Sequence, residues 1–564
     1  MIKLFNKKNF LHRNYLYINR YREIISILIK YGFNEFVYAN KLTKYLNLGT
    51  KGLKKKNKNK IQYTSSERIR MVFEELGPTF IKFGQIISNR PDLVPDELLI
   101  ELEKLQEAVP PFPAEYSIKT IESELKNPIN ILFREFNPVP IASASIAQVH
   151  KAILHSGEVV AVKVQRPNIS QIIETDIEIM FFIATLIEKH IHGLDILNPT
   201  GIIKEFERTI KKEVDFRVEA SHIEHFFENF KNDSNIYVPK IYRNFSTKKV
   251  LTMEFIDGVK LSNINSSNFS INPKLIAERG VDAILKQIFN HGFFHADPHP
   301  GNILILKNNT ICFLDFGMMG ALSKNHKEQL GNIILGIVYK DSKRITDSVE
   351  KISESRKIDN KEQVEVQIFE LLEEFAFLPL KNINMGDILN RLIVLIISNK
   401  IKISPNFYLL IKALITAEGV GRKLNPDFNI IKHIEPFARN IILDRLNPFN
   451  LAEEAYFSAN NYAILFRDLP KDLKDILEQI KNGKIKVEFE HRGVEPIIRK
   501  YFQITNHTIL AIILSAIIIG SSVIIHSGIS PKLYDIPLVG IIGFLGAGIL
   551  GVWLIIAILR DGKK

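Results

Sequence analysis

The residues with the clearest chemical potential lie in two short motifs, HADPHPGN at 295–302 and LDFG at 314–317. Asp297 and Asn302 stand five positions apart in the first motif, and Asp315 opens an Asp-Phe-Gly in the second. Carboxylate and amide oxygens are the ligands that Mg²⁺ prefers, and a further carboxylate can orient or deprotonate a hydroxyl group or a water. The motifs therefore predict a metal-phosphate site, with Asn302 and Asp315 as metal ligands and Asp297 as a catalytic residue.

His295 and His299 are four positions apart, which raises the alternative of a zinc site. Two histidines at this spacing bind one metal ion when both project from one face of a helix. Pro298 lies between them, and a proline lacks the backbone N–H and breaks such a helix. The prolines indicate a loop, so we exclude the zinc site.

The order and spacing of the two motifs match the catalytic loop and the metal-binding loop of protein kinases. Upstream, VAVK at 160–163 ends in Lys163, inside a run typical of a β-strand. In a kinase this lysine contacts the α- and β-phosphates of ATP and pairs with a helix glutamate. A strand lysine more often belongs only to a solvated face, but its position before both other motifs favours the functional interpretation. Lys163 is therefore a second predicted catalytic residue and a ligand of ATP.

Kinases cover the phosphates with a glycine-rich loop about twenty residues before this lysine, whereas this chain has IASASIAQV there, without glycine. Alanine carries a Cβ, so it adopts positive φ less readily than glycine and keeps a phosphate further from the backbone. We expect a nucleotide loop that is stiffer than that of a protein kinase, or differently aligned. Its predicted cofactor-binding residues are Ile141, Ala142, Ser143, Ala144, Ser145, Ile146, Ala147, Gln148 and Val149.

Three motifs make the chain resemble the UbiB family of atypical kinase-like proteins, which is associated with ubiquinone and related isoprenoid-lipid metabolism. They are the alanine-rich loop ASASIAQVHKA, KFGQ at 82–85, which matches a K-x-G-Q motif, and EVDFRVEA at 213–220, which matches E-x-D with a following glutamate. The resemblance covers roughly residues 18 to 460, and no motif position departs from the family pattern.

The resemblance implies roles for five further residues. In that family the K-x-G-Q helix folds over the place where a peptide substrate would lie, and the E-x-D residues face the nucleotide. Carried over, Lys82 and Gln85 would cap the nucleotide site. Glu213 and Asp215 would engage the metal ion or the K-x-G-Q lysine, and Glu219 would pair with the strand lysine. From the sequence alone, acids at this spacing more often form a solvated helix face.

The activity implied by the resemblance is Mg²⁺-dependent hydrolysis of ATP, or transfer of its terminal phosphate to a lipid-like or small molecule, in support of membrane quinone synthesis. Membrane lipids and other quinone-biosynthesis proteins are the expected partners. Two alternatives stay open. A phosphotransferase similar to aminoglycoside or choline kinases shares the two loop motifs but does not account for KFGQ or EVDF. A non-enzymatic scaffold would use ATP only as a conformational ligand.

A small β-rich part carried on a larger helical part would position these residues. The runs IAQVHKAIL and VVAVKVQ, separated by HSGE, predict a hairpin, and YVPKIYRNF with VLTMEFIDG forms a second β-rich stretch. The predicted fold class is α+β: a bilobal protein-kinase-like fold with an N-terminal helical extension and a C-terminal transmembrane helix hairpin. Helical patterns are expected at roughly 64–110, 168–193, 199–229, 272–291 and 322–480.

With 564 residues the chain exceeds what one hydrophobic core usually supports. We therefore expect several parts. They are a basic N-terminal segment with an amphipathic helix (1–60), the K-x-G-Q helical extension (61–130), an N-lobe with inserted helices (131–260), a helical C-lobe (261–500) and two transmembrane helices (501–564).

The formal net charge of +12 is concentrated at the N-terminal end, where residues 1–60 hold 15 Lys/Arg and 2 Glu. The densest stretch, at 49–60, indicates a solvated linker, with contact to anionic lipid headgroups as the alternative. Nucleic acid is not an expected partner, because no interleaved aromatic residues accompany the charge. Apolar residues at helical spacing in 18–37 predict a retained amphipathic helix rather than a cleaved leader. The single cysteine, Cys312, allows no intramolecular disulfide, which favours a reducing cytosol.

Two stretches near the C-terminus carry no charge, Ile509 to Ile525 and Ile536 to Leu559. The second would span about 36 Å as a helix, enough to cross a hydrocarbon core of about 30 Å. Basic residues flank the outer ends of the pair. The positive-inside rule therefore places both ends and the catalytic body on the cytoplasmic side of a bacterial inner membrane. Glycines in the second stretch would permit close helix packing. Two buried core helices are the alternative.

Overall fold

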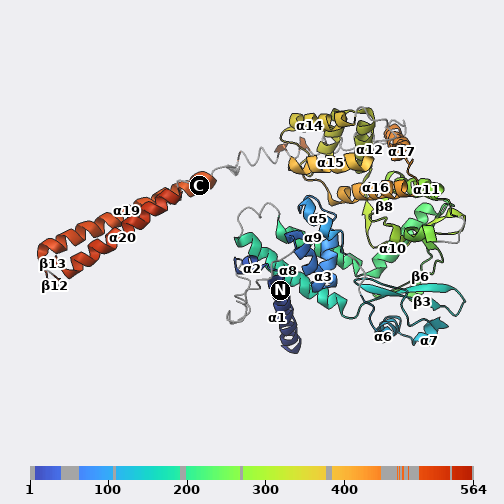
Figure 1. Cartoon of the computed structure of the whole chain (residues 1–564), viewed down its shortest axis with the longest axis horizontal. Coiled ribbons are helices and arrows are strands. Elements are labelled where there is room, and N and C mark those ends of the chain that lie inside the picture. Colours follow the sequence, from blue (N-terminus) through green and yellow to red (C-terminus); the bar gives the residue numbers. More distant parts are fainter. Residues whose placement is uncertain are drawn as a thin grey trace. The chain divides into compact units, whose positions relative to one another are not determined.

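The computed structural model describes residues 7–39, 63–105, 110–190, 198–266, 271–375, 384–445, 495–533 and 536–561, with a few isolated positions between 467 and 481. Internal contacts divide the chain into two units, Met1–Glu453 and Glu454–Lys564. Figure 1 shows the elements of both units, and each unit is described by itself.

A five-stranded antiparallel sheet forms the β-rich part of the first unit. Its strands are β1 (Glu135–Phe136), β2 (Ala142–Ser143), β3 (Ala147–Ile153), β4 (Val159–Gln165) and β6 (Val250–Glu254). The predicted hairpin is confirmed, since β3 and β4 pair in register with Val149 opposite Lys163. The turn between them uses Gly157 at a φ of +100°, a conformation that favours glycine.

The two faces of this sheet have different roles because side chains alternate along each strand. Val160, Val162 and Val164 point to one face and are fully buried with Phe133 and Ile121 in a separate apolar cluster. That face is covered by α6 (Ala114–Leu125) and α7 (Ile129–Leu132), whereas α10 (Phe216–Phe230) approaches from the other side (Figure 1). Lys163 belongs to the α10 face.

The predicted helix at 199–229 is wrong as one element, because the chain breaks between α9 (Pro199–Glu213) and α10. Asp215 caps α10 by accepting a hydrogen bond from the Arg217 amide at 3.1 Å. The Val214 carbonyl, which α9 leaves unpaired, accepts from the Gln165 side chain at 2.7 Å. An Asp that can act as N-cap thus competes with helix continuation at this point.

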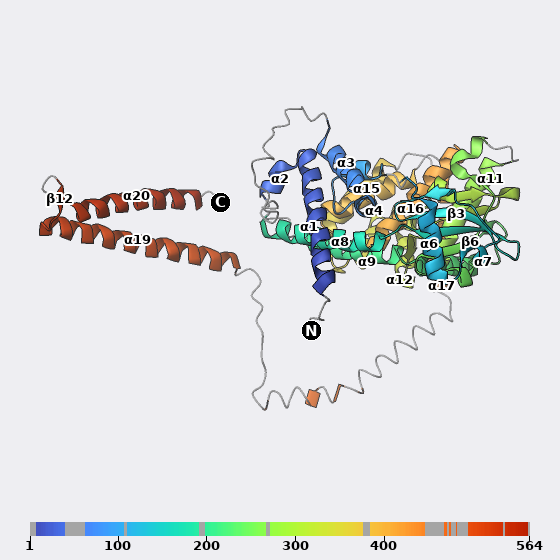
Figure 2. The ribbon, with the colours of Figure 1, turned by 90° about the horizontal axis from the view of Figure 1, so that it is seen from below.

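The N-terminal helices pack against α8 (Ile169–His190), as Figure 2 shows for α1 (Lys7–Lys30). Arg20 on α1 binds the buried carboxylate of Asp176 on α8, with Nε to Oδ1 at 2.7 Å. The predicted helix at 18–37 is divided, because Gly32 at a φ of +85° ends α1 before α2 (Asn34–Ala39). The Phe33 amide bonds back to the Leu28 carbonyl, which is a Schellman ending.

The K-x-G-Q extension consists of α3 (Ser65–Leu76), α4 (Pro78–Ile87) and α5 (Asp96–Leu102). The predicted capping box is confirmed. Thr64 accepts from the Glu67 amide, and the Glu67 carboxylate accepts from the Thr64 amide. KFGQ lies in α4, in which both Lys82 and Gly84 are buried.

The larger part of the first unit is mainly helical, as predicted. After α11 (Pro273–Leu285) and a π-helical turn come four short strands that carry the motif loops. They are β8 (Phe293–His295), β9 (Ile303–Ile305), β10 (Ile311–Phe313) and β11 (Met319–Ala321). The helices that follow are α12 (Lys324–Tyr339), α13 (Ser342–Ile352), α14 (Lys361–Glu374), α15 (Met385–Ser398), α16 (Pro405–Leu424) and α17 (Ile430–Arg445). Most of the expected helical pattern beyond 445 lies outside the described residues.

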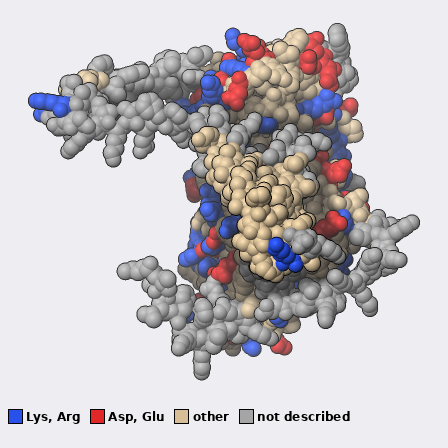
Figure 3. Space-filling model, turned by 90° about the vertical axis from the view of Figure 1, so that its left-hand side faces the viewer, with Lys and Arg blue, Asp and Glu red and all other residues tan. Residues whose placement is uncertain are grey.

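The second unit contains two long helices, α19 (Glu495–Ser527) and α20 (Leu538–Asp561), joined by the short strands β12 (Lys532–Leu533) and β13 (Ile536–Pro537). Within them, Thr505–Ser527 and Leu538–Ile555 are long and apolar enough to cross a membrane, and only 6% and 11% of these windows are buried. Figure 3 looks onto the β12–β13 end of this unit and shows a surface with few charged side chains.

The predicted role of the glycines in helix packing holds for some of them only. A Cβ on Gly543 would lie 2.1 Å from the Ser521 hydroxyl, and one on Gly551 would contact Leu514 at 3.4 Å. Gly546 and Gly548 have no such neighbour within 4 Å. Helix α20 therefore approaches α19 through its Gly543 and Gly551 positions.

Candidate functional site

The strand lysine and the helix glutamate form the buried ion pair expected from the motifs. Lys163 Nζ donates to both carboxylate oxygens of Glu219 at 2.8 and 2.9 Å. Glu219 lies in the first turn of α10, where the helix dipole favours a negative charge. Burial alone would lower the pKa of Lys163, but the carboxylates of Glu219 and Asp315 raise it above its ordinary value. Lys163 is therefore held as a cation on the α10 face of the sheet.

Asp315 follows β10 and lies 4.0 Å from Lys163 Nζ. Its Oδ1 accepts a hydrogen bond from the Gly317 amide at 3.0 Å. Burial would raise the pKa of Asp315, but Lys163, the Gly317 amide and Lys82 together lower it to about 2. The carboxylate is thus ionised throughout the neutral range, as a ligand of a divalent cation must be.

The catalytic loop is tied to the metal loop through the backbone. The Leu314 amide, one residue before Asp315, donates to the Asn302 carbonyl at 3.0 Å. Inside the loop, the His299 amide bonds to the Asp297 carbonyl and the Asn302 amide bonds to the His299 carbonyl, each at 2.8 Å. These bonds place Asn302 beside the metal loop and keep Asp297 on the same turn.

His295 belongs to this site, although the sequence indicates it only as part of the excluded zinc site. It is buried, its Nδ1 accepts from the Asp297 amide at 3.2 Å, and its Nε2 donates to the Asp315 carbonyl. Burial lowers the pKa of His295, which keeps the neutral tautomer that both bonds require. One imidazole therefore links the backbone of the catalytic loop to that of the metal loop.

His222 on α10 holds the next peptide group, because its Nδ1 donates to the Phe316 carbonyl at 2.9 Å. Burial lowers the pKa of His222 as well, and Lys212 and His225 act in the same direction. Glu219 and His222 lie on one helix, so α10 positions both the strand lysine and the metal loop. Their i, i+3 spacing was the only signal in the sequence that could have found His222.

The K-x-G-Q helix reaches the site through its lysine. Lys82 Nζ lies 2.5 Å from Glu213 Oε1, and both side chains are largely buried. This is the partner that the resemblance implied for Lys82. Gln85 donates from Nε2 to the Leu105 carbonyl at 3.2 Å, and its buried Oε1 has no partner among the described residues. Gln85 thus anchors α4 to the end of the extension.

Two predicted site residues point elsewhere. The Asp215 carboxylate accepts from the Arg217 guanidinium at 2.9 and 2.6 Å while it caps α10, so its hydrogen bonds are made to Arg217. Gln148 lies on the α6 face of the sheet, one position out of phase with Val149 and Lys163. There it binds the Phe112 amide and carbonyl at 3.1 and 3.2 Å. The motif predicts Gln148 in the nucleotide loop because position in a motif does not reveal strand phase.

The alanine-rich loop is the hairpin between β2 and β3. Ala142 pairs with Val149 and Ser143 with Gln148, and the Ala144 amide closes the turn by donating to the Ala147 carbonyl at 2.8 Å. Ile141 at its start is 50% exposed, whereas Ser145, Ile146 and Ala147 are buried. Val149 shares the face of Lys163, so the loop enters the site from the lysine side of the sheet.

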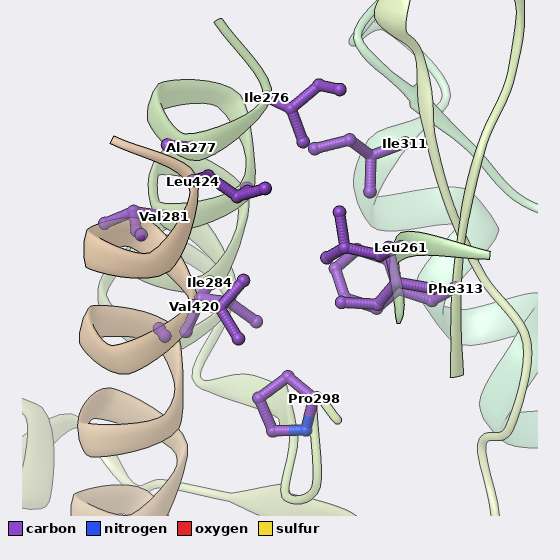
Figure 4. Close-up of a pocket in the computed structure, with 14 residues that line it drawn as sticks. Leu261, Ile276, Ala277, Val281, Ile284, Pro298, Ile311, Phe313, Val420 and Leu424 are labelled. Carbon is purple, nitrogen blue, oxygen red and sulfur yellow. The ribbon is translucent and has the colours of Figure 1, made fainter. Parts of the chain in front are cut away.

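An apolar cavity of about 30 Å³ lies between α11 and α16 on one side and Ile311 on the other (Figure 4). Pro298 and Phe313 line it together with Leu261, Val281 and Val420. None of Lys163, Glu219 and Asp315 lines it, so the cavity is separate from the charged groups of the site.

Comparison with known proteins agrees with this geometry. Sequence models of three domains match the chain: the ABC1 atypical kinase-like domain at residues 104–349, the UbiB helical domain at 368–429 and the ABC1/UbiB kinase-like C-terminal domain at 492–560. A "Probable protein kinase UbiB" from Marinobacter nauticus is 34% identical over 74% of this chain and 77% of its own length. The chain belongs to the ABC1/UbiB family of atypical kinase-like proteins.

Two further proteins are similar to this chain. An "Uncharacterized protein in hydrogenase 1 5'region" from Clostridium pasteurianum is 33% identical over 97% of this chain and 99% of its own length. Among solved structures, the Rv3197–erythromycin complex from Mycobacterium tuberculosis covers 61% of this chain and 91% of its own, with 23% identity and a TM-score of 0.40.

The UbiB-type site suits a metal ion held mainly by a nucleotide. Among the described residues, no group of three or more His, Cys, Asp or Glu side chains is arranged to hold a metal by itself. Mg²⁺ is commonly bound by one or two protein oxygens together with substrate phosphates and waters. An ionised Asp315 beside the Asn302 loop, with the Lys163 cation 4.0 Å away, fits that mode of binding.

Proposed function

We propose that this protein binds Mg-ATP between the sheet and the motif loops and hydrolyses it or transfers its terminal phosphate. The observation that carries the proposal is the convergence of Lys163, paired with Glu219, on an ionised Asp315. Asp315 and Asn302 would hold Mg²⁺, which supplies charge neutralisation for the phosphates. Lys163 would bind the phosphates, and Asp297 would orient the attacking hydroxyl group or water.

The acceptor of the phosphate is proposed to be water or a small or lipid-like molecule rather than a protein. Helix α4 supports this, because its Lys82 is buried and fixed to Glu213 next to the nucleotide groups. Lys82 also lowers the pKa of Asp315, so α4 lies close to the metal loop, where it would hinder a bulky peptide. Membership in the UbiB family points to support of isoprenoid-quinone or related lipid synthesis at a membrane, with membrane lipids and quinone-biosynthesis proteins as partners.

The location is proposed to be a cell membrane, with α19 and α20 as its anchor. Their apolar windows and the small buried share of each support this. The catalytic unit would lie in the cytoplasm, since the basic residues flank the outer ends of the pair.

Nucleotide binding and phosphate release by the full-length protein in liposomes test the activity. We expect a Mg²⁺-dependent thermal shift with ATP that is lost when Lys163 and Asp315 are both neutralised. Release of phosphate should fall at least about a hundredfold in Asp297→Asn. Asp359→Asn, an exposed aspartate far along the chain from the motifs, is the control and should match the wild type.

Two outcomes would contradict the proposal in different ways. A well-folded wild type without a Mg²⁺-dependent shift would exclude the nucleotide site. A shift without any phosphate release, with or without membranes, would instead support the scaffold that uses ATP as a conformational ligand. Lipid extracts from cells that lack the protein test the pathway, and an unchanged quinone and precursor profile would count against a role in quinone synthesis.

A further inference from the structure

The alanine-rich loop has a guanidinium group behind it that no motif pointed to. Arg166 follows the strand lysine by three positions, and its backbone amide donates to the Ile146 carbonyl at 2.8 Å. Its side chain then turns back toward the loop. Nε donates to the Ser145 carbonyl at 3.2 Å, and Nη2 donates to the Ala144 carbonyl at 3.3 Å and the Ser143 hydroxyl at 3.2 Å.

The guanidinium group lies on the face of the sheet away from Lys163. It packs over the Phe112 ring at 5.3 Å, and its Nη2 also donates to the Pro110 carbonyl at 2.8 Å. Phe112 is in turn held by Gln148, whose strand phase places it on the α6 face. Arg166 therefore contacts the loop from behind, relative to the predicted nucleotide.

The direction of two amide groups follows from these contacts. In a trans peptide the C=O and the following N–H point in opposite directions. Because the carbonyls of Ala144 and Ser145 point to Arg166, the amides of Ser145 and Ile146 point away from it, toward the Lys163 face. Two successive amides directed to one side form an anion-binding arrangement of the kind that holds phosphates.

These amides also lack the partners that buried amides normally have. Ser145 and Ile146 are 1% and 5% exposed, and neither amide donates to an acceptor in the described part of the chain. Buried backbone donors are rarely left unpaired, so an unpaired pair points to a ligand. Arg166 itself has no carboxylate within 4.0 Å among the described residues, and its positive charge adds to the attraction for an anion.

We propose that Arg166 is a positioning residue that directs the Ser145 and Ile146 amides at the phosphates of the bound nucleotide. This inference rests on the proposed binding of ATP and adds a part to it. In a glycine-rich loop, backbone freedom lets the amides turn to the phosphate. Here alanine and serine restrict that freedom, and a fixed cation behind the loop holds the two carbonyls so that the amides are oriented before the nucleotide binds.

The test compares phosphate-dependent affinity in four full-length proteins: the wild type, Arg166→Ala, Arg166→Lys and Arg279→Ala. Arg279, which lies on α11, is a matched control because it is also half-buried. It donates to two loop carbonyls, those of Asn308 and Asn309, at 2.8 and 2.9 Å. Titrations with Mg-ATP, Mg-ADP and adenosine separate contacts to the phosphates from contacts to the nucleoside.

We expect Arg166→Ala to weaken Mg-ATP and Mg-ADP binding about tenfold, the usual effect of losing charge-assisted hydrogen bonds, and to leave adenosine binding unchanged. Arg166→Lys should lie between, since one ammonium can hold one or two of the carbonyls. Methylguanidinium added to Arg166→Ala should restore ATP affinity, and Arg279→Ala should match the wild type. If Arg166→Ala does not fold, Arg166→Lys against Arg279→Ala provides the same comparison.

Equal ATP affinity in the wild type and Arg166→Ala would overturn the inference. So would an equal loss of ATP and adenosine affinity, because that result would indicate general damage to the lobe. In both cases the proposed function would stand, since wild-type ATP binding is measured in the same titrations. Absence of ATP binding in the wild type would reject both the function and the inference.

Discussion

The carboxylate of Glu219 receives the Lys163 ammonium through both of its oxygens, while Asp315 lies 4.0 Å from the same nitrogen. The lysine is therefore shared unequally between a structural partner on α10 and the metal loop. This arrangement leaves room for a phosphate to take a place near Lys163 without breaking the pair that positions it.

Glu219→Gln tests that pair with little change of shape. The amide keeps one acceptor but loses the charge that offsets the buried ammonium, so Lys163 should move toward Asp315. We expect the free energy of unfolding to fall by about 2 kcal/mol and ATP affinity to fall with it. Thermal and denaturant unfolding with nucleotide titration measure both quantities. Glu224 lies on the same helix as Glu219 and forms an exposed pair with Arg243, which lies outside that helix, so Glu224→Gln should change stability by less than about 1 kcal/mol.

The two histidines that hold the metal loop predict a loss of stability in mild acid. Burial lowers the pKa of His222, whereas the unfolded chain binds the proton near the ordinary value of about 6.5. The unfolded state therefore takes up more protons below that pH, and stability that is complete above it is lost as the pH falls toward the lowered value.

His222→Gln checks this dependence, because a glutamine amide can donate to the Phe316 carbonyl but does not titrate. The slope of the thermal midpoint between pH 7 and pH 5 should be shallower in this variant than in the wild type. His433 is partly exposed and pairs with Asp282 outside the site. The pH slope of the thermal midpoint in His433→Gln is therefore measured as the comparison. Parallel slopes in His222→Gln and the wild type would show that His222 is not protonated in this window.

The kinase-like motifs predicted Lys163 and Asp315, because the identity of these residues and their order along the chain carry that signal. The pairing of Lys163 with Glu219 and that of Lys82 with Glu213 were implied by the resemblance to the UbiB family, because acids at this spacing alone more often form a solvated helix face. Gln148 and Asp215 differ from these residues. The phase of β3 directs the Gln148 side chain to the α6 face, and the Asp215 carboxylate is the N-cap of α10.

His295 and Arg166 could not have been assigned from the motifs because both act on backbone carbonyls. A carbonyl is present at every position, so the sequence holds no partner residue to search for. The same limit explains the divided helices. The sequence shows a glycine at position 32 and an aspartate at position 215. Whether Gly32 or Asp215 interrupts a helix depends on the groups that pack there, such as the Gln165 side-chain amide, which donates to the Val214 carbonyl.

Gln148→Leu separates the structural role of this residue from the predicted nucleotide role. The leucine would leave the Phe112 amide and carbonyl and the Ser117 hydroxyl with unmet hydrogen bonds, so we expect a loss of about 2 kcal/mol in stability. Adenosine affinity should not change, since Gln148 lies on the far face of the sheet. A variant of normal stability with weakened adenosine binding would instead support the predicted role of Gln148 in nucleotide binding.

Thiol labelling tests the proposed orientation of the α19–α20 pair. Cys312 is fully buried, so a cysteine introduced at an exposed position would be the reactive one. Ile529→Cys, 61% exposed between the two helices, should react with a membrane-impermeant maleimide in intact cells. Ser156→Cys, exposed in the β3–β4 turn, should react only after the membrane is opened. The reverse pattern would contradict a cytoplasmic catalytic unit.

Gly84 gives the K-x-G-Q motif a packing role that its charged residues do not suggest. A Cβ at this position would lie 2.3 Å from Leu105 Cδ1 and 2.8 Å from Phe73 Cδ2. Gly84→Ala should therefore push α4 away from α3 and the end of α5, at a cost of about 1–3 kcal/mol in the free energy of unfolding. Because Lys82 lies on the same helix, its ion pair with Glu213 should loosen and ATP affinity should fall.

Gly419→Ala is the matched control, since Gly419 lies inside α16 and has no heavy atom within 4 Å of an added Cβ. Alanine is the better helix former there, so this variant should gain up to about 1 kcal/mol. Denaturant unfolding and ATP titration of both variants compare packing with propensity. Equal gains would mean that α4 has space for a methyl group, and that the motif glycine does not set the distance between Lys82 and the metal loop.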